Sequence, residues 1–265
     1  MLQDDRPSGR PNRWRLLLLV AVLSLLVGGR PASAAIIFFD DTFADADWNL
    51  TSFVNNAGST LGVQQAAGGN LGAFRKVTTN VGPAPIGHAA QILGFHRNLF
   101  AMFDPAALGA ITSLDYSEDA IMLNGFGDGQ ASGPALRQNG QVYIRYAVFA
   151  KDANWTPKGF AGLTQNSFSL VNLSDTTIVD GTQHPDFSAG GSLIDFGFFR
   201  FNATCISCGA YSIVAGIDNW RIQINQPNPE PEPSPVVPEP SSVFLLGSGI
   251  LGLVGWTRRR APRSS

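Results

Sequence analysis

The amino-acid sequence predicts an all-β protein folded as an antiparallel β-sandwich, with a closed barrel as the alternative. Short apolar or alternating runs recur between breaks rich in Gly, Asn, Asp and Pro, and no stretch of the central chain keeps a helical period. The composition agrees, because 29 of the 265 residues are Gly, and 44% are hydrophobic against 14% charged. A disordered chain would carry more charge and fewer aromatic residues, so this chain can build a sizeable core.

The first 34 residues are typical of a secretory signal peptide. Four arginines precede an apolar run from Leu16 to Val27, and the small residues Ala32-Ser33-Ala34 follow it. The run is short for a membrane span, which favours cleavage before Ala35 over an uncleaved N-terminal anchor. We therefore expect the secretion translocon and a signal peptidase among the partners.

Residues 35–225 form the predicted extracytoplasmic domain, a length that suits a single domain. The clearest strand is Gln141–Ala150, whose side chains alternate between two faces. Short helical turns are expected at Asp104–Leu108 and Ser117–Asp119. The candidate strands are 36–39, 74–79, 89–95, 99–103, 111–116, 120–123, 141–150, 168–173, 176–179, 193–202, 211–215 and 217–224.

The first and last strands of this domain are expected to pair. The run Phe38–Phe43 opens the domain, and Ala215–Ile222 closes it with Trp220 and Ile222 on one face. These two runs resemble the edges of jelly-roll lectin-like and carbohydrate-binding modules. The resemblance implies a jelly-roll-like sandwich for the domain.

The same resemblance implies a structural calcium site. In such modules an early carboxylate and an Asp of the last strand share the ion, and the matching positions here are Asp41, with Asp40 as its alternative, and Asp218. Carboxylates suit a hard cation. The competing interpretation is that Asp218-Asn219 makes only a turn or bulge.

Beyond residue 225 the chain changes character. Residues 226–237 are rich in Pro, which favours an extended polyproline II linker. The tail, 238–265, begins with Pro238-Glu239-Pro240, continues with an apolar run at 243–256 and ends with a basic stretch at 258–263. As a helix, residues 241–257 would extend about 25 Å, slightly less than the ~30 Å hydrocarbon core of a bilayer.

This order of elements resembles the PEP-CTERM sorting tail of exported bacterial proteins. The resemblance is carried by Pro238, Glu239 and Pro240 together with the arginines Arg258, Arg259 and Arg260. It implies a single transmembrane sorting helix and an exosortase-like transpeptidase as partner. An ordinary C-terminal anchor with a proline-rich neck is the alternative.

The two cysteines, Cys205 and Cys208, have the spacing C-x-x-C. Outside the cytoplasm we expect them to form a structural disulfide in a loop between strands. Gly209 occupies the position where attached haem requires His, and no further zinc ligands lie close in sequence.

Exposed aromatic side chains often form the platform for a sugar ring, and the sequence offers four candidates: Trp48, Trp155, Tyr143 and Tyr146. Trp155 is the preferred glycan-binding residue, because it lies in the polar loop Asp152–Gly159. No catalytic residue is assigned, since the three histidines fit no catalytic or metal motif and no nucleophile elbow is present.

Acidic residues outnumber basic ones between residues 35 and 226, which argues against a nucleic-acid partner. The prediction is an exported surface or extracellular-matrix protein, held at the inner membrane before its tail is processed. Its domain is expected to be non-catalytic, with a structural or glycan-binding role and exopolysaccharide as the candidate partner. The alternatives are an extracellular jelly-roll glycan hydrolase and a permanently anchored adhesin.

Overall fold

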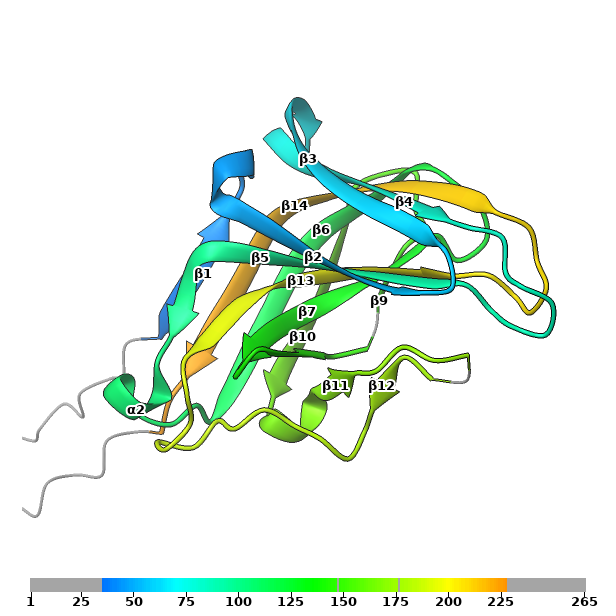
Figure 1. The fold of residues 1–265 in the computed structure, drawn as a ribbon. Helices are drawn as coiled ribbons and strands as arrows, with labels where there is room; N and C mark the ends of the chain where they lie inside the picture. Colours follow the sequence, from blue (N-terminus) through cyan, green and yellow to red (C-terminus); the bar gives the residue numbers. More distant parts are fainter. Residues whose placement is uncertain (1–34, 147, 176, 228–265) are drawn as a thin grey trace, which may run out of the picture. The chain divides into compact units, whose positions relative to one another are not determined.

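The computed structural model describes residues 35–146, 148–175 and 177–227. There the chain folds into two antiparallel sheets packed face to face (Figure 1). The predicted antiparallel sandwich is therefore confirmed. None of the helices in the described ranges is long and apolar enough for a membrane span. The predicted signal peptide, 1–34, and sorting tail, 238–265, lie outside the described residues.

The first sheet, called sheet A here, has its strands in the order β10, β6, β14, β4 and β3, and β1 also pairs with β14. Its strands are β1 (Ile36–Asp40), β3 (Gly58–Gly69), β4 (Gly72–Val81), β6 (Ser113–Asn124), β10 (Thr156–Leu163) and β14 (Tyr211–Asn225).

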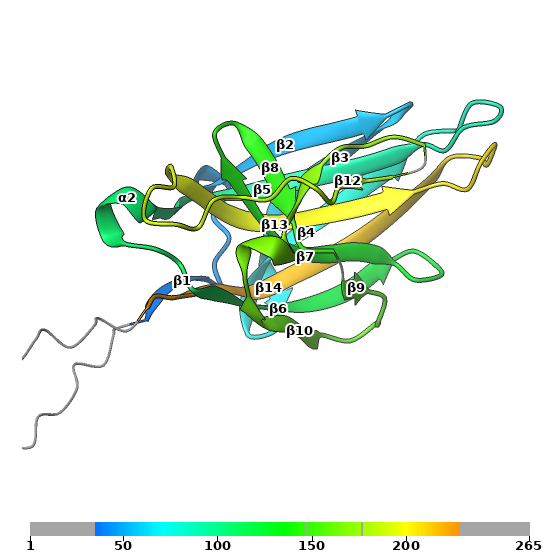
Figure 2. The same cartoon turned by 90° about the horizontal axis from the view of Figure 1, so that it is seen from below.

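The second sheet, sheet B, has the order β12, β11, β8, β7, β13, β5 and β2, and β9 also pairs with β7. Its strands are β2 (Trp48–Asn55), β5 (Gln91–Phe103), β7 (Gln130–Gln138), β8 (Gln141–Ile144), β9 (Val148–Ala150), β11 (Ser169–Val171), β12 (Val179–Asp180) and β13 (Ile194–Ala203). The short helices are η1 (Asp45–Asp47), α2 (Pro105–Leu108) and η2 (Gln165–Ser167). Figure 2 shows the two sheets from below.

The ends of the domain pair as the sequence predicted. β1 runs antiparallel to β14, with Phe38 opposite Ile222 and Asp40 opposite Trp220. Trp220 and Ile222 are buried, which confirms their common inward face. The ladder between β14 and β6 shifts register after Asp218, where Asn219 has a φ of 50°. A β-bulge therefore stands at the Asp218-Asn219 position.

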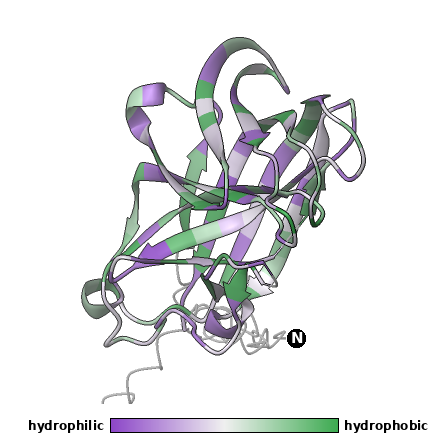
Figure 3. Ribbon diagram, turned by 45° about the vertical axis from the view of Figure 1, so that its right-hand side comes forward, coloured by the Kyte–Doolittle hydropathy of each residue, from purple (hydrophilic) through white to green (hydrophobic). Residues whose placement is uncertain are grey.

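One part of the space between the sheets is filled by apolar side chains. It includes the rings of Trp48, Phe198 and Trp220, and Trp48 meets the other two at centroid distances of 5.3 and 5.1 Å. Figure 3 shows hydrophobic and hydrophilic residues alternating along many of the strands, as expected when one face of a strand points inward. Burial of this aromatic cluster is the main apolar stabilisation between the sheets.

A second part of the same interior is polar. Arg75 and Glu118 project into it from sheet A, and His96, Ser132 and Arg200 project into it from sheet B; all five are buried. Arg200 pairs with Glu118 at 3.4 Å, and Arg75 donates to Nδ1 of His96 at 3.5 Å. These contacts connect the two sheets through charged and polar groups, which are costly to bury unless they are paired.

The outer face of sheet B is covered by the chain itself. Leu93, Phe95 and Phe199 form a second apolar cluster on that face. Side chains from the segment around β11 and β12, including Leu173 and Ile178, pack against it. These contacts bury part of the outer face of sheet B.

Several details of the strand prediction were wrong, and two of them bear on the sites. The predicted strand Gln141–Ala150 is interrupted, because β8 ends at Ile144 and β9 begins at Val148. The turn expected at Ser117–Asp119 is instead the middle of β6, where Glu118 points inward to accept hydrogen bonds from Ser132 at 2.6 and 2.9 Å. A polar triplet can remain extended when its central side chain finds buried partners.

Candidate functional site

The main candidate site is a groove at the end of the sandwich where β13 ends and β14 begins. We call it the aromatic groove. Its first part has a volume of about 280 Å³. The aromatic side chains of the lining are Phe126, Tyr146, Phe149, Phe201 and Tyr211. Phe126 is 62% exposed and Tyr146 44% exposed, so both present ring surface to solvent.

The groove continues towards the cysteine loop. A second hollow of about 500 Å³ shares Phe126, Ala203 and Tyr211 with the first and adds Thr204 and Cys208. Phe126 and Tyr211 meet edge to face, with their centroids 5.2 Å apart. The Tyr211 hydroxyl donates to the Ala203 carbonyl at 2.7 Å, and burial raises the pKa of this phenol. Tyr211 is therefore a fixed, neutral part of the groove.

The turn between β6 and β7 places Phe126 at the groove. Gly125, Gly127 and Gly129 all have positive φ, a backbone conformation that Gly adopts without strain. A Cβ on Gly129 would lie 2.1 Å from the Ala150 carbonyl oxygen, so only Gly allows this approach. Asp128 lies in the same turn, is exposed, and has no hydrogen bond among the described residues.

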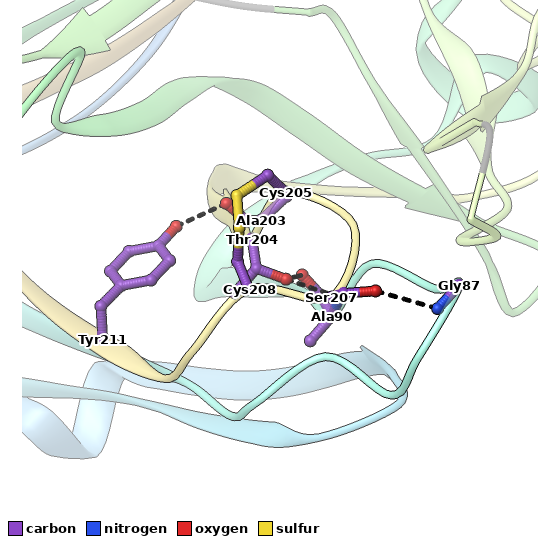
Figure 4. The surroundings of a disulfide bond; sticks show 8 residues. All are labelled: Gly87, Ala90, Ala203, Thr204, Cys205, Ser207, Cys208 and Tyr211. Carbon is purple, nitrogen blue, oxygen red and sulfur yellow. Dashed lines mark hydrogen bonds between the residues drawn. A yellow bond between two sulfur atoms is a disulfide. The ribbon is translucent and has the colours of Figure 1, made fainter.

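The predicted disulfide is present and borders the groove (Figure 4). Cys205 and Cys208 are joined, with their Cα atoms 5.3 Å apart. Ser207, between them, accepts a hydrogen bond from the Gly87 amide at 3.0 Å, and the Cys208 carbonyl accepts one from Ala84 at 2.9 Å. The disulfide thus holds the loop that forms one wall of the groove against the 82–90 loop.

The structure separates the four aromatic candidates of the sequence. Tyr146 lines the groove, whereas Tyr143 and Trp48 are buried. Trp155 is half-buried, donates from Nε1 to the Gly68 carbonyl at 3.1 Å, and packs edge-on against Phe74 at 5.4 Å. Its role in glycan binding stays a prediction.

Of the residues predicted to bind calcium, Asp40 is engaged by protein donors. Its Oδ1 accepts from the Thr42 amide and hydroxyl and from the Phe43 amide, and its Oδ2 accepts from Trp48 Nε1 at 2.7 Å. These hydrogen bonds occupy Oδ1 and leave Oδ2 one lone pair. Asp40 instead fixes the turn that follows β1.

Asp218 has the opposite environment. Its Oδ2 is buried and has no hydrogen-bond partner among the described residues. Desolvation raises the pKa of this carboxyl, and the charges of Asp119 and Asp41 raise it further. The position that a Cβ on Gly69 would take lies 2.6 Å from this Oδ2 and 2.5 Å from the Ala73 carbonyl oxygen. The described residues contain no group of three or more His, Cys, Asp or Glu side chains that could hold a metal ion. Calcium at Asp218 therefore stays a prediction.

The predicted sorting residues lie outside the described residues. The comparison that bears on them is one of sequence. Residues 236–260 match the PEP-CTERM protein-sorting motif. The chain carries a PEP-CTERM sorting motif. All six predicted sorting residues, Pro238, Glu239, Pro240, Arg258, Arg259 and Arg260, fall within the matched range. A PEP-CTERM motif implies an exported protein that is anchored at the membrane before processing, with an exosortase as the processing partner.

No curated protein matches the sequence of this PEP-CTERM chain. Among solved structures, it is similar to the family 11 carbohydrate-binding module of the cellulase Lic26A-Cel5E of Clostridium thermocellum, at 13% identity and a TM-score of 0.42, over 75% of this chain and 100% of that one. It is also similar to the CBM22-1 xylan-binding domain of Xyn10C from Paenibacillus barcinonensis, at 10% identity and a TM-score of 0.36, over 74% and 99% of the two chains. Similarity at this level does not extend to the ligand.

Sequence reasoning missed most of the groove. Phe126, Phe149 and Tyr211 come from three separate segments, and no periodic pattern relates their positions. The one available signal was the alternation Gly125-Phe126-Gly127, in which a large aromatic residue stands between two glycines of an exposed turn. A glycine-rich turn has no need of such a residue for its own conformation.

Proposed function

We propose that this exported PEP-CTERM protein binds a glycan in the aromatic groove. In this proposal an exosortase-like enzyme first cuts the exported chain near Pro238-Glu239-Pro240. The cut releases the domain to the cell envelope or extracellular matrix. Exopolysaccharide is the candidate ligand there. The observation that carries the proposal is the groove itself, in which exposed Phe126 and Tyr146 flank a polar turn.

The chemistry of the groove favours a sugar. Aromatic faces bury the C–H surface of a pyranose ring, and Tyr carries a hydroxyl for its polar edge. Tyr146 supplies such a hydroxyl, and Asp128 supplies a carboxylate that can accept from sugar hydroxyl groups. Asn202 is already engaged, since it donates to Gly129 at 2.9 Å and accepts from Gln130 at 3.2 Å, and it therefore stiffens the floor.

The test compares two aromatic surfaces of the same domain. We expect Phe126→Ala/Tyr146→Ala to weaken glycan binding at least tenfold, because tenfold corresponds to only about 1.4 kcal/mol and aromatic hot spots often exceed that. A glycan array identifies the ligand and calorimetry measures the affinity. The sample is the full chain, in a detergent without a sugar headgroup.

The matched control is Leu61→Ala, which removes an apolar side chain 59% exposed on β3, outside the residues that line the groove. Trp155→Ala tests the alternative platform predicted from sequence. Loss of binding in Trp155→Ala with full binding in the double variant would move the site to the β3–β4 hairpin. No binding of the unsubstituted chain to any glycan would favour a purely structural domain.

Two alternative functions, a glycan hydrolase and a permanently anchored adhesin, can be distinguished from this proposal. A hydrolase requires two facing carboxyl groups, and Asp128 is the one carboxylate among the residues that line the groove. This supports binding without catalysis. A permanently anchored adhesin would be recovered from membranes with residues 241–265 still attached, which intact mass measurement detects.

We also propose that Asp218 holds a structural calcium ion, with Asp41 as the second acidic residue. The ion would satisfy the unpartnered Oδ2 and offset the repulsion from Asp119 and Asp41. We expect millimolar calcium to raise the melting temperature, because a ligand of the native state stabilises it by mass action. Asp218→Asn should lose most of this response, and Asp128→Asn is the matched exposed control. A melting temperature that a chelator leaves unchanged would contradict the proposal.

A further inference from the structure

A separate hollow lies at the other end of β14, between the edges of the two sheets. We call it the edge hollow. It has a volume of about 250 Å³. Its lining includes Phe39 of β1, Asp47 of η1, Asn98 and Phe100 of β5, and Trp220 of β14. None of these residues lines the aromatic groove.

Two phenylalanines flank the edge hollow and are largely exposed. Phe39 is 54% exposed and Phe100 is 71% exposed. Both lie on edge segments: β1 pairs only with β14, and the pairing of β2 with β5 ends at Asn98. Neither ring contributes to the buried clusters of the core. The fold therefore gives no reason for two large rings at this place.

Three polar groups of the edge hollow have no hydrogen-bond partner among the described residues. Asn98 is buried, and its Oδ1 accepts from the Phe100 amide at 2.9 Å. This bond fixes the orientation of the amide and leaves its Nδ2 without a partner among the described residues. The Asp47 carboxylate likewise has no hydrogen bond there. Trp220 is fully buried, and its Nε1 is also without a partner in the described part of the chain.

Of these groups Trp220 Nε1 is the buried one, and buried polar groups normally find a partner in the protein or in a ligand. Two aromatic faces, an amide donor and a carboxylate acceptor in one hollow match the two surfaces of a sugar ring. The apolar C–H face of the ring would lie on Phe39 or Phe100, and neighbouring hydroxyl groups would meet Asn98 and Asp47. The volume is below the ~300–1,000 Å³ of sites for larger ligands, which suits a single ring.

We infer that the edge hollow is a second saccharide site, which takes one pyranose ring. The two sites lie towards opposite ends of β14, since Tyr211 lines the groove and Trp220 lines the edge hollow. Tyr211 and Trp220 are nine residues apart on β14, which corresponds to about 30 Å at ~3.3 Å per residue. Together with the proposed function, on which this consequence rests, a site at each end allows one domain to bridge two glycan chains.

The experiment examines the edge hollow in a chain whose groove is disabled. Saturation-transfer NMR is recorded with glucose, galactose and mannose on the full-length Phe126→Ala/Tyr146→Ala variant. We expect a transfer signal from at least one hexose, and its loss when Phe39→Ala and Phe100→Ala are added. Leu61→Ala in the same background is the matched control and should keep the signal.

Failure of the edge variant to fold would not end the test, because Asp47→Ala removes an unpaired carboxylate and should weaken the same signal. No hexose signal in the groove-disabled chain, or a signal unchanged by both sets of substitutions, overturns the second site. The proposal for the aromatic groove still holds in that case, provided that Phe126→Ala/Tyr146→Ala no longer binds the glycan that the unsubstituted chain binds on the array. A hexose signal that is lost with Phe39→Ala and Phe100→Ala, without any array ligand for the unsubstituted chain, supports the edge hollow and contradicts glycan binding in the groove.

Discussion

We expect Glu118→Ala to lower the free energy of unfolding by about 3–5 kcal/mol, or to prevent folding. Glu118 is fully buried between the sheets, where it pairs with Arg200 at 3.4 Å and accepts hydrogen bonds from Ser132 and the Tyr116 hydroxyl. Removing the carboxylate would leave the Arg200 guanidinium buried with only the Gly216 carbonyl as a hydrogen-bond acceptor, at 3.3 Å, among the described residues. An uncompensated buried cation is among the costliest defects a core can carry.

Chemical denaturation at neutral pH measures this effect. The double variant Glu118→Leu/Arg200→Met should recover most of the loss, because apolar residues can replace a buried ion pair with little or no net cost. Asp128→Ala, which removes an exposed carboxylate, is the control and should change the stability by less than about 0.5 kcal/mol. A loss below 1 kcal/mol in Glu118→Ala would show that the pair is not desolvated as the structure indicates.

The sequence predicted those strands that are apolar. β1 and β13 were expected within a few residues of their true ends, because their buried faces are marked by Phe and Ile. β14 was expected as two strands, 211–215 and 217–224, which together cover nearly all of it. The short helix α2 was also expected, since Asp104 caps it and Pro105 begins it. In each of these elements the local signal and the tertiary environment agree.

Four strands were not predicted: β2, β3, β7 and β10. β7 is almost entirely buried but reads Gln130-Ala-Ser-Gly-Pro-Ala-Leu-Arg-Gln138, with few β-branched or large apolar residues. Its burial follows from its neighbours β13 and β8 and from the buried hydrogen bonds of Ser132 and Gln130. Such partners come from distant parts of the chain, so no window of sequence contains the signal.

The candidate sites, like the strands, were predictable from sequence only where the signal is local. The C-x-x-C disulfide was predictable, because both partners lie within four residues. Phe39 and Phe100 come from separate strands, and only the fold shows that they face one hollow. For calcium, the sequence left Asp40 and Asp41 as alternatives, and Asp40 also accepts four hydrogen bonds from its own turn and from Trp48, which the sequence did not predict. Sites formed by residues close in sequence could therefore be predicted, whereas sites formed by residues from separate strands could not.

The second large effect concerns His96 and the pH dependence of stability. His96 is fully buried, stacks on Phe198 with ring centroids 4.6 Å apart, and lies between Arg75 and Arg200. Burial lowers the pKa of this imidazole well below 6.5, and the charges of Arg75 and Arg200 lower it further. His96 is consequently neutral in the folded protein, while it titrates normally in the unfolded chain.

The sign of the effect follows from proton linkage. Between the lowered pKa of the folded state and about 6.5, the unfolded chain binds one more proton at this position than the folded one. The stability that His96 contributes is fully present above about pH 6.5 and is lost as the pH falls, with a slope approaching 1.4 kcal/mol per pH unit. Unfolding free energies of the unsubstituted chain, measured by denaturant between pH 5 and 8, should show this decline.

His96→Gln removes the titrating ring and retains an acceptor near Arg75. We expect this variant to be less stable at pH 7.5 by about 1–3 kcal/mol, because it loses the stacking on Phe198 and some packing. Its stability should fall less steeply below pH 6.5, so the difference from the unsubstituted chain narrows with acid. Parallel pH profiles for His96→Gln and the unsubstituted chain would show that His96 takes up a proton equally in both states, which its place between two buried arginines argues against.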